Sequence, residues 1–149
     1  MNIALYAGSF DPFTKGHLDI LEQAAQLFDS VTIAVANNSE KQNFLSVEKR
    51  LELIKKSTCG LNNVTVDSYN GLTIEYAKKN GINILIRGVR NSADFEYEYQ
   101  ISNTNRLIFP DIKTVLLTPN PKYSFISSTI VREIYKNGGD ISKLVPQAW

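Results

Sequence analysis

The chain has 149 residues, of which 43% are hydrophobic and 21% charged, and its formal net charge is +1. This length and composition are typical of one globular domain with its own core, and we place that domain at residues 1–149. A net charge so close to zero provides no general basic field for nucleic acid, so any anion site must be built from local charges. The single cysteine, Cys59, excludes an internal disulfide and a cysteine-rich metal centre.

The sequence gives no reason to expect a membrane-spanning or secretory segment. No apolar run approaches the length needed to cross a bilayer. Met1 leads directly into a predicted strand, so we expect no signal peptide. The expectation is a cytoplasmic enzyme or binding domain that contacts neither a membrane nor nucleic acid.

Five short apolar runs, several of them rich in β-branched residues, alternate with helical patterns along the chain. Continuous apolar runs are typical of strands that are buried on both faces of a parallel sheet. The predicted strands are residues 3–6, 31–35, 64–66, 82–86 and 114–117.

The helices are predicted from apolar periodicity and from their end signals. Thr14 can cap a first helix whose apolar face covers residues 18–28, and Ser46 can cap a second. Gly81 ends a third helix over residues 72–80 as a left-handed cap, and Pro110 ends a fourth that begins at residue 94. A fifth helix begins at residue 127 or 128 and ends at 138–139, and residues 141–144 form one further turn.

This alternation predicts a Rossmann-like, doubly wound α/β fold, with a five-stranded parallel sheet in the order 3-2-1-4-5 and helices on both faces. The polar, glycine-containing or basic stretches all follow strands, so they share the carboxyl edge of the sheet. Residues far apart in sequence are therefore expected to converge on one crevice at that edge. The stretches are residues 8–17, 37–43, 69–73, 87–90 and 118–128.

The turn after the first predicted strand contains the only histidine of the chain. Gly8 allows the backbone of this turn to approach a ligand, and Gly16 leaves room above the first helical turn. His17 then lies at the N-terminus of the helix, where free N–H groups favour an anion. From local chemistry alone, His17 is either a catalytic residue or a structural histidine.

Two arginines follow the fourth predicted strand. Arg87 ends this buried strand and needs an anionic partner, and Arg90 follows it closely. Forked guanidinium groups suit phosphate oxygens, so the pair indicates a phosphate site. The alternative is an internal ion pair with an acidic residue of the next helix, namely Asp94, Glu96 or Glu98.

Three other segments contribute candidate groups. Lys41, in the loop after the second strand, is either a solvated lysine or a phosphate partner. Glu98 can bind a ribose hydroxyl or hold an arginine, and the aromatic residues around it indicate a subunit contact. Ser127, Ser128 and Thr129 present hydroxyl and backbone donors to an anion at a helix start.

Several common site patterns are absent. Without a G-x-G-x-x-G or a G-x-x-x-x-G-K-[ST] sequence, neither a dehydrogenase-type dinucleotide site nor a P-loop is expected. No His, Cys and carboxylate cluster has metal-ligand spacing, and there is no nucleophile elbow.

The sequence S-F-D-P-x-T-x-G-H at residues 9–17 resembles the T/H-x-G-H signature of the nucleotidyltransferase superfamily, in which it binds nucleotide phosphates. Two further motifs narrow the resemblance to the bacterial phosphopantetheine adenylyltransferases, which make dephospho-coenzyme A. They are R-G-V-R-x-x-x-D-F-E-Y-E-x-Q at 87–100 and I-S-S-T-x-V-R at 126–132. In this chain Ser9 stands where that family usually has Thr, and Ala7 stands where it usually has Pro.

The resemblance implies the reaction ATP + 4′-phosphopantetheine → dephospho-coenzyme A + pyrophosphate, by direct in-line displacement without a covalent intermediate. It implies that His17 stabilises the transition state and that Mg²⁺ is held mainly by ATP phosphates and water. The acceptor would be bound by Ser9, Lys41, Thr73 and Arg87. The implied ATP-binding residues are Ser9, Phe10, His17, Gly88, Val89, Arg90, Glu98, Tyr123, Ser124, Phe125, Ile126, Ser127, Ser128 and Thr129.

The resemblance also implies a homohexamer, with coenzyme A as a candidate feedback ligand. Two alternatives stay open at the level of sequence. One is a sister adenylyl- or cytidylyltransferase with another phosphorylated acceptor. The other is a non-catalytic nucleotide-binding regulator on the same fold.

Overall fold

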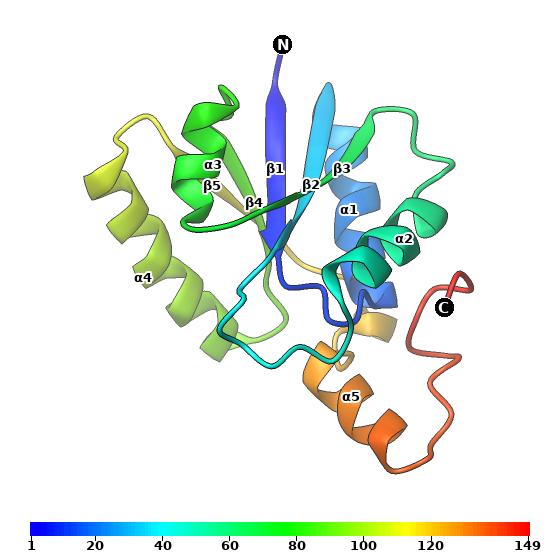
Figure 1. The fold of residues 1–149 in the computed structure, drawn as a ribbon. Helices are drawn as coiled ribbons and strands as arrows, with labels where there is room; N and C mark the ends of the chain where they lie inside the picture. The colour runs from blue at the N-terminus through cyan, green and yellow to red at the C-terminus, as the bar shows by residue number, and fades with distance from the viewer.

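A parallel sheet of five strands forms the centre of the molecule in the computed structural model, which describes residues 1–149. The strand order is β3-β2-β1-β4-β5, as predicted, and every neighbouring pair is parallel. All carboxyl ends of the strands therefore lie at one edge, the lower edge in Figure 1. The strands are β1 (Ile3–Gly8), β2 (Ser30–Ala36), β3 (Val64–Tyr69), β4 (Ile84–Gly88) and β5 (Lys113–Leu117).

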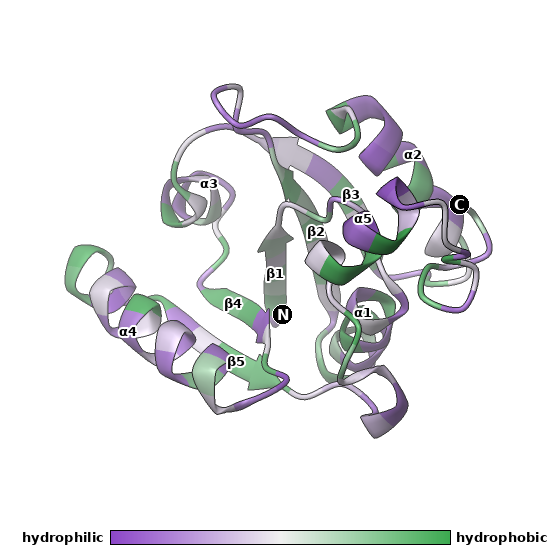
Figure 2. Cartoon of the chain, turned by 90° about the horizontal axis from the view of Figure 1, so that it is seen from below, coloured by the Kyte–Doolittle hydropathy of each residue, from purple (hydrophilic) through white to green (hydrophobic).

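Helices cover both faces of the sheet. In Figures 1 and 2, α1 and α2 lie on one face and α3 and α4 on the other, which confirms the doubly wound arrangement. The fifth helix, α5, lies beyond the carboxyl edge of the strands rather than over a face (Figure 1). The helices are α1 (Lys15–Leu27), α2 (Val47–Ser57), α3 (Thr73–Lys79), α4 (Ser92–Ile108) and α5 (Ser128–Lys136).

The core is divided by the sheet because neighbouring side chains of a strand point to opposite faces. In β1, Ala4 and Tyr6 join the cluster under α1 and α2, whereas Leu5 and Ala7 join the cluster under α3. All four residues are buried. Burial on both faces explains why β1 is a continuous apolar run in the sequence.

Every strand differs from its predicted bounds by one to three residues at one or both ends, and two of these differences have a clear structural cause. β3 continues to Tyr69, which is paired with Ala36 of β2, although its last residues include polar Asp67 and Ser68. β4 begins at Ile84 rather than at residue 82, because the Ile82 N–H bonds to the carbonyl of helix α3 at Ala77, at 2.9 Å. Apolar content alone could not locate either end.

The end signals of the helices are largely confirmed. Thr14 and Ser46 are N-caps, and Gly81 follows α3 with a φ of +68°. α4 begins at Ser92, two residues earlier than predicted, because Asn91 caps it by accepting a hydrogen bond from the Asp94 N–H at 2.9 Å.

The segment after α5 folds back against the body of the protein. Ile141 and Val145 pack on Val131 of α5, and the predicted turn is present, with the Leu144 N–H bonded to the Ile141 carbonyl at 2.8 Å. A short 3-10 helix, Pro121–Tyr123, was not predicted. No helix has both the length and the apolar character that crossing a bilayer requires.

Candidate active site

The turn between β1 and α1 is fixed by side chains from other elements. Both carboxylate oxygens of Asp11 accept backbone N–H bonds, from Phe44 and Leu45, at 2.8 Å each. Arg50, which is fully buried in α2, donates to the Ser9 carbonyl at 2.8 Å. These bonds tie the turn to the segment that leads into α2.

The other side of this turn is held by α5. Arg132 donates through Nη1 to the Asp11 carbonyl at 2.7 Å, and Ser128 Oγ donates to the Pro12 carbonyl at 2.9 Å. The turn is therefore clamped between two helices that are far from it in sequence. Such clamping positions the residues of the turn before any ligand binds.

His17 is held in one tautomer. The Thr14 N–H can only donate, and it lies 3.1 Å from His17 Nδ1, so Nδ1 accepts and the ring proton is on Nε2. The imidazole stacks on Phe13, with ring centroids 5.7 Å apart, and meets Phe10 edge-on at 5.1 Å. This leaves Nε2–H as the only donor that the ring can offer to a ligand.

Electrostatics keep this histidine neutral. Burial, with additional repulsion from Arg90 and Arg87, lowers the pKa of His17 from 6.5 to about 3. A neutral imidazole near pH 7 can donate a hydrogen bond but is too weak a base to remove a proton efficiently.

A cavity of about 350 Å³, here called the main cavity, opens at the carboxyl edge of the sheet. It collects residues from the β1–α1 turn, the end of β4, the first half of α4 and the start of α5, as the carboxyl-edge argument predicted. The predicted site residues that line it are Ser9, Phe10, His17, Arg87, Gly88, Arg90, Glu98, Ile126, Ser127, Ser128 and Thr129.

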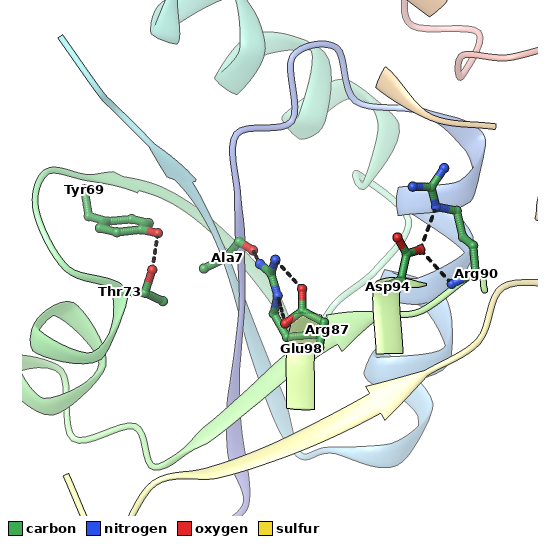
Figure 3. A network of polar contacts seen from close by, with 7 residues as sticks. All are labelled: Ala7, Tyr69, Thr73, Arg87, Arg90, Asp94 and Glu98. Carbon is green, nitrogen blue, oxygen red and sulfur yellow. Dashed lines mark hydrogen bonds and ion pairs between the residues drawn. The ribbon is translucent and has the colours of Figure 1, made fainter. Parts of the chain in front are cut away.

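Arg87 has the acidic partner that the sequence allowed, and that partner is Glu98 (Figure 3). Nε and Nη2 of Arg87 donate to the carboxylate at 2.9 and 2.8 Å, and Nη1 donates to the Ala7 carbonyl at 2.7 Å. Burial by itself lowers the pKa of Arg87. The hydrogen bonds and the negative charge of Glu98 have a larger opposite effect, so the pKa of Arg87 is raised above its ordinary value. The pair remains at the cavity wall, where 36% of the Arg87 side chain is exposed.

Arg90 makes a second, weaker pair at the same wall. Its Nε lies 3.2 Å from the Asp94 carboxylate, which also accepts the Arg90 backbone N–H (Figure 3). Nη1 of Arg90 reaches the Ile126 carbonyl, just before α5, at 3.4 Å. Arg90 thus joins the start of α4 to the start of α5 across the cavity.

The start of α5 provides backbone donors. Ser127 is the N-cap, and its Oγ accepts the Ile130 N–H at 3.2 Å. The N–H groups of Ser128 and Thr129 have no protein partner. Unpaired N–H groups at a helix N-terminus favour an anion, so the hydroxyl-rich motif supplies an anion-binding wall to the cavity that His17 also lines.

Two predicted acceptor-binding residues lie outside the main cavity. Thr73 begins α3, shares a 2.7 Å hydrogen bond with the Tyr69 hydroxyl (Figure 3), and lines a second cavity of about 380 Å³. Arg87 and Glu98 line both cavities, so the two spaces adjoin at this ion pair. Lys41 is exposed in the loop after β2 and lines neither cavity.

Four predicted ATP-binding residues do not line the main cavity either. Val89 is buried and its N–H pairs with the Leu117 carbonyl at 2.9 Å, whereas Phe125 is 86% exposed. Tyr123 and Ser124 belong to the 3-10 helix and the residue after it. Val89 and Phe125 are each adjacent in sequence to residues that line the cavity, whereas Tyr123 and Ser124 are not.

Sequence reasoning missed several residues of the site. The main cavity is also lined by Tyr6, Ile20 and Tyr97, which were treated only as parts of apolar or aromatic patterns. Arg50 could have been found, because it lies three residues after Val47 and therefore on the inward face of α2. The interior partner of such an arginine is not visible in sequence.

The fold and the site together define a nucleotidyltransferase of the cytidylyltransferase-like class. The model of the cytidylyltransferase-like family matches residues 5–134. A solved structure from Vibrio parahaemolyticus, provisionally assigned as a nicotinate-nucleotide adenylyltransferase, superposes with a TM-score of 0.72. It covers 98% of this chain and 88% of its own at 19% sequence identity, which supports the fold alone.

Curated relatives narrow the class further. Proteins named phosphopantetheine adenylyltransferase are 53% identical over 145 residues in Gloeothece citriformis and 49% identical over 146 residues in Desulforudis audaxviator. These alignments cover 97% and 98% of this chain, and 92% and 90% of the two relatives. The chain belongs to the phosphopantetheine adenylyltransferase family, which confirms the resemblance drawn from its motifs.

Proposed function

We propose that this enzyme transfers the adenylyl group of ATP to 4′-phosphopantetheine, giving dephospho-coenzyme A and pyrophosphate. The observation that carries the proposal is the neutral His17, whose Nε2–H has no protein partner and which lines the main cavity together with the N-terminus of α5. Donors placed in this way bind phosphate oxygens and stabilise charge that develops on them.

The reaction is a single displacement at phosphorus. A phosphate oxygen of the acceptor forms a bond to the α-phosphorus of ATP, while the bond from that phosphorus to the oxygen bridging to the β-phosphate breaks. Pyrophosphate leaves with the electron pair. The second pKa of a phosphate monoester is about 6, so the acceptor is already largely dianionic at neutral pH and requires no general base.

This mechanism agrees with the state of His17. Its low pKa makes it unsuited to remove a proton, whereas its Nε2–H can donate to a non-bridging oxygen of the α-phosphate. The remaining task of the enzyme is to bring two anionic substrates into line. Arg90 and the start of α5 would hold the nucleotide, and Arg87 would reduce repulsion between the two phosphates.

The two adjoining cavities support a two-substrate site. ATP would occupy the main cavity, which Ser9 also lines, and the acceptor would extend from Arg87 toward Thr73 in the second cavity. Lys41 lines neither cavity, so its proposed contact with the acceptor would require the loop after β2 to move. The second cavity is lined partly by apolar side chains, including Leu72, Ile74 and Ile101, which suits an uncharged pantetheine arm better than a second nucleotide.

Mg²⁺ is expected to accompany ATP. The chain contains no cluster of three His, Cys, Asp or Glu side chains that would form a metal cage. The two carboxylates at the main cavity, Asp94 and Glu98, are each already paired with an arginine. This donor set fits a cation held by triphosphate oxygens and water, where it would neutralise the β- and γ-phosphates.

We also propose a homohexamer that works in the cytoplasm, where ATP is available. Helix α4 exposes large apolar side chains that a subunit contact would cover, among them Phe95, Tyr97, Tyr99 and Leu107. Coenzyme A differs from the proposed product by one phosphate, so it is a candidate feedback ligand at the same cavities. Size-exclusion chromatography with light scattering tests the hexamer, and inhibition by coenzyme A tests the feedback.

The decisive experiment is pyrophosphate release from ATP with and without 4′-phosphopantetheine. Acceptor-dependent release is expected with ATP and not with CTP. Release with CTP, or with nicotinate mononucleotide as acceptor, would favour a sister transferase. No release with any acceptor, despite nucleotide binding, would favour a non-catalytic regulator.

His17→Ala tests the catalytic role directly. Loss of a transition-state donor is expected to lower kcat by roughly 10²-fold or more while ATP still binds. Steady-state kinetics and ATP titration measure the two effects separately. Near-normal turnover in this variant would remove His17 from the mechanism.

A further inference from the structure

The hydroxyl of Tyr6 is a polar group at the main cavity that the mechanism above does not use. The side chain is only 4% exposed, and its ring packs edge-on against Phe10 with 5.1 Å between centroids. Tyr6 nevertheless lines the main cavity. The hydroxyls of Tyr69 and Tyr76 bond to Thr73 and Asp67, whereas the Tyr6 hydroxyl has no protein partner. The buried polar atoms without a partner are Arg50 Nη2 and Thr114 Oγ1, so the Tyr6 oxygen is not sealed in the interior and is open to the cavity that Tyr6 lines.

Gly88 keeps space open beside this hydroxyl. A Cβ atom at position 88 would lie 3.9 Å from the Tyr6 oxygen and 3.3 Å from Cγ1 of Ile20. A larger side chain would occupy the space that separates the hydroxyl from the rest of the cavity. The glycine therefore leaves room for a ligand atom to reach Tyr6.

The side of the sheet on which Tyr6 lies indicates which substrate reaches it. Tyr6 belongs to the cluster under α1, the helix that carries His17. Its neighbour Leu5 belongs to the cluster on the opposite face together with Ile74 of α3, and Ile74 lines the second cavity. A ligand group at Tyr6 thus belongs to the molecule that binds beside His17.

The hydroxyl is a donor at any physiological pH. Burial raises the pKa of Tyr6 well above its ordinary value, and the positive charges of Arg87 and Arg90 only partly oppose that effect. The proton therefore stays on the oxygen. The same two arginines make the surroundings attractive to an anionic ligand, so a phosphate-bearing molecule is drawn to the donor.

We propose that the Tyr6 hydroxyl donates a hydrogen bond to an oxygen of bound ATP, in the ribose and α-phosphate portion beside His17. Tyr6 is then a nucleotide-binding residue whose hydroxyl, open to the main cavity, is bonded by the substrate. The choice of ATP rests on the proposed function. The presence of an unpaired donor beside the space left by Gly88 is independent of the proposed function.

Tyr6→Phe removes only the hydroxyl and retains the ring contact with Phe10. We expect the dissociation constant of Mg-ATP, measured by isothermal titration calorimetry, to rise about fivefold, the usual effect of losing one neutral donor. The KM for 4′-phosphopantetheine should stay within about twofold of its original value. Tyr76→Phe is the matched control for ATP affinity, because it also removes one tyrosine hydroxyl, but Tyr76 lines neither cavity and its hydroxyl bonds to Asp67.

The melting temperature of Tyr6→Phe distinguishes a ligand-binding hydroxyl from a structural one, because loss of a structural hydroxyl would lower it. Because the hydroxyl has no protein partner, Tyr6→Phe without nucleotide should melt at the same temperature as the wild type or higher. A lower melting temperature with unchanged ATP affinity would overturn the proposal, as would a loss confined to 4′-phosphopantetheine. If the wild type binds ATP through Tyr6 but releases no pyrophosphate, the proposed function fails and this inference stands.

Discussion

At the scale of single residues, the environment of His17 determines what it can do. Donation from the Thr14 N–H assigns the ring proton to Nε2, and burial holds the pKa at about 3. A group in this state is a fixed neutral donor, unlike a histidine that exchanges protons during the reaction. The sequence indicated a histidine at a helix N-terminus, but its tautomer and its pKa depend on contacts that only the fold supplies.

The lowered pKa of His17 predicts a pH-dependent loss of stability. The unfolded chain binds a proton at His17 below about pH 6.5, whereas the folded chain does not until about pH 3. The unfolded state therefore gains protons first, and stability falls as the pH falls through this window. His17→Gln removes the effect, so the difference between wild type and variant should change by up to about 1.4 kcal/mol per pH unit.

Urea unfolding at about pH 7 and about pH 5 measures this difference. The His17→Gln variant serves as the reference for the wild type, because every other titrating group is common to both proteins. If the free energies of unfolding of wild type and variant change in parallel between the two pH values, His17 is not buried as a neutral ring in solution.

Arg87 provides a second residue-scale prediction, because its ion pair with Glu98 permits both a structural and a substrate-binding role. Arg87→Ala should raise the KM for 4′-phosphopantetheine roughly tenfold or more, with a smaller effect on ATP, since a charged hydrogen bond is lost. It should also reduce stability by leaving Glu98 unpaired.

The double variant Arg87→Ala with Glu98→Gln separates these roles. Removing the unpaired carboxylate should recover stability, measured by urea unfolding, without recovering the acceptor KM. Recovery of both quantities would show that Arg87 serves only to neutralise Glu98.

At the scale of elements, the parts that the sequence predicted well are those with local causes. N-caps at Thr14 and Ser46 and the left-handed cap at Gly81 act within one helical turn, so their residues are visible in a short window. The end of β3 at Tyr69 depends on pairing with β2, and the start of β4 depends on the preceding helix. Such ends require partners that a single window does not contain.

Asp11 connects two elements and gives an element-scale prediction. Its two carboxylate oxygens accept the N–H groups of Phe44 and Leu45, and the residue is buried. Asp11→Asn turns an amide NH₂ toward one of these N–H donors, so one bond is lost and a donor is left unpaired. We expect a loss of about 1–3 kcal/mol in the free energy of unfolding and a lower kcat, because the β1–α1 turn is loosened.

The matched control is Asp29→Asn. Asp29 is exposed and accepts only the Asn2 N–H, so its replacement should change stability by about 0.5 kcal/mol or less. Equal losses in the two variants, measured by urea unfolding, would mean that the contacts of Asp11 do not hold the turn.

At the scale of the whole molecule, the site is a product of parallel topology. Placing every strand's carboxyl end at one edge was enough to predict that His17, Arg87, Arg90 and Ser127–Thr129 would meet. Topology does not tell which side chains fill the space between them. The second cavity is lined by residues of α3, β4, α4 and β5 and adjoins the first at Arg87, an arrangement that no motif encodes.

A cluster of three aromatic side chains joins distant parts of the chain. Phe44, three residues after Lys41, stacks with Trp149 at 6.2 Å between centroids and meets Tyr135 of α5 edge-on at 5.4 Å. Tyr135 and Trp149 are themselves in contact at 5.9 Å. The loop that carries Lys41 is thereby fastened to α5 and to the segment after it.

Loss of this cluster should open the loop. Trp149→Ala removes two aromatic pairs, each worth about 1 kcal/mol, so tryptic cleavage after the exposed Lys41 should accelerate roughly tenfold. The KM for 4′-phosphopantetheine should rise, while ATP affinity stays close to wild type. Trp149→Phe, which keeps a ring on Phe44, should resemble the wild type in both respects. Unchanged cleavage at Lys41 in Trp149→Ala would mean that the loop is held by its own backbone and by Asp11, without the aromatic cluster.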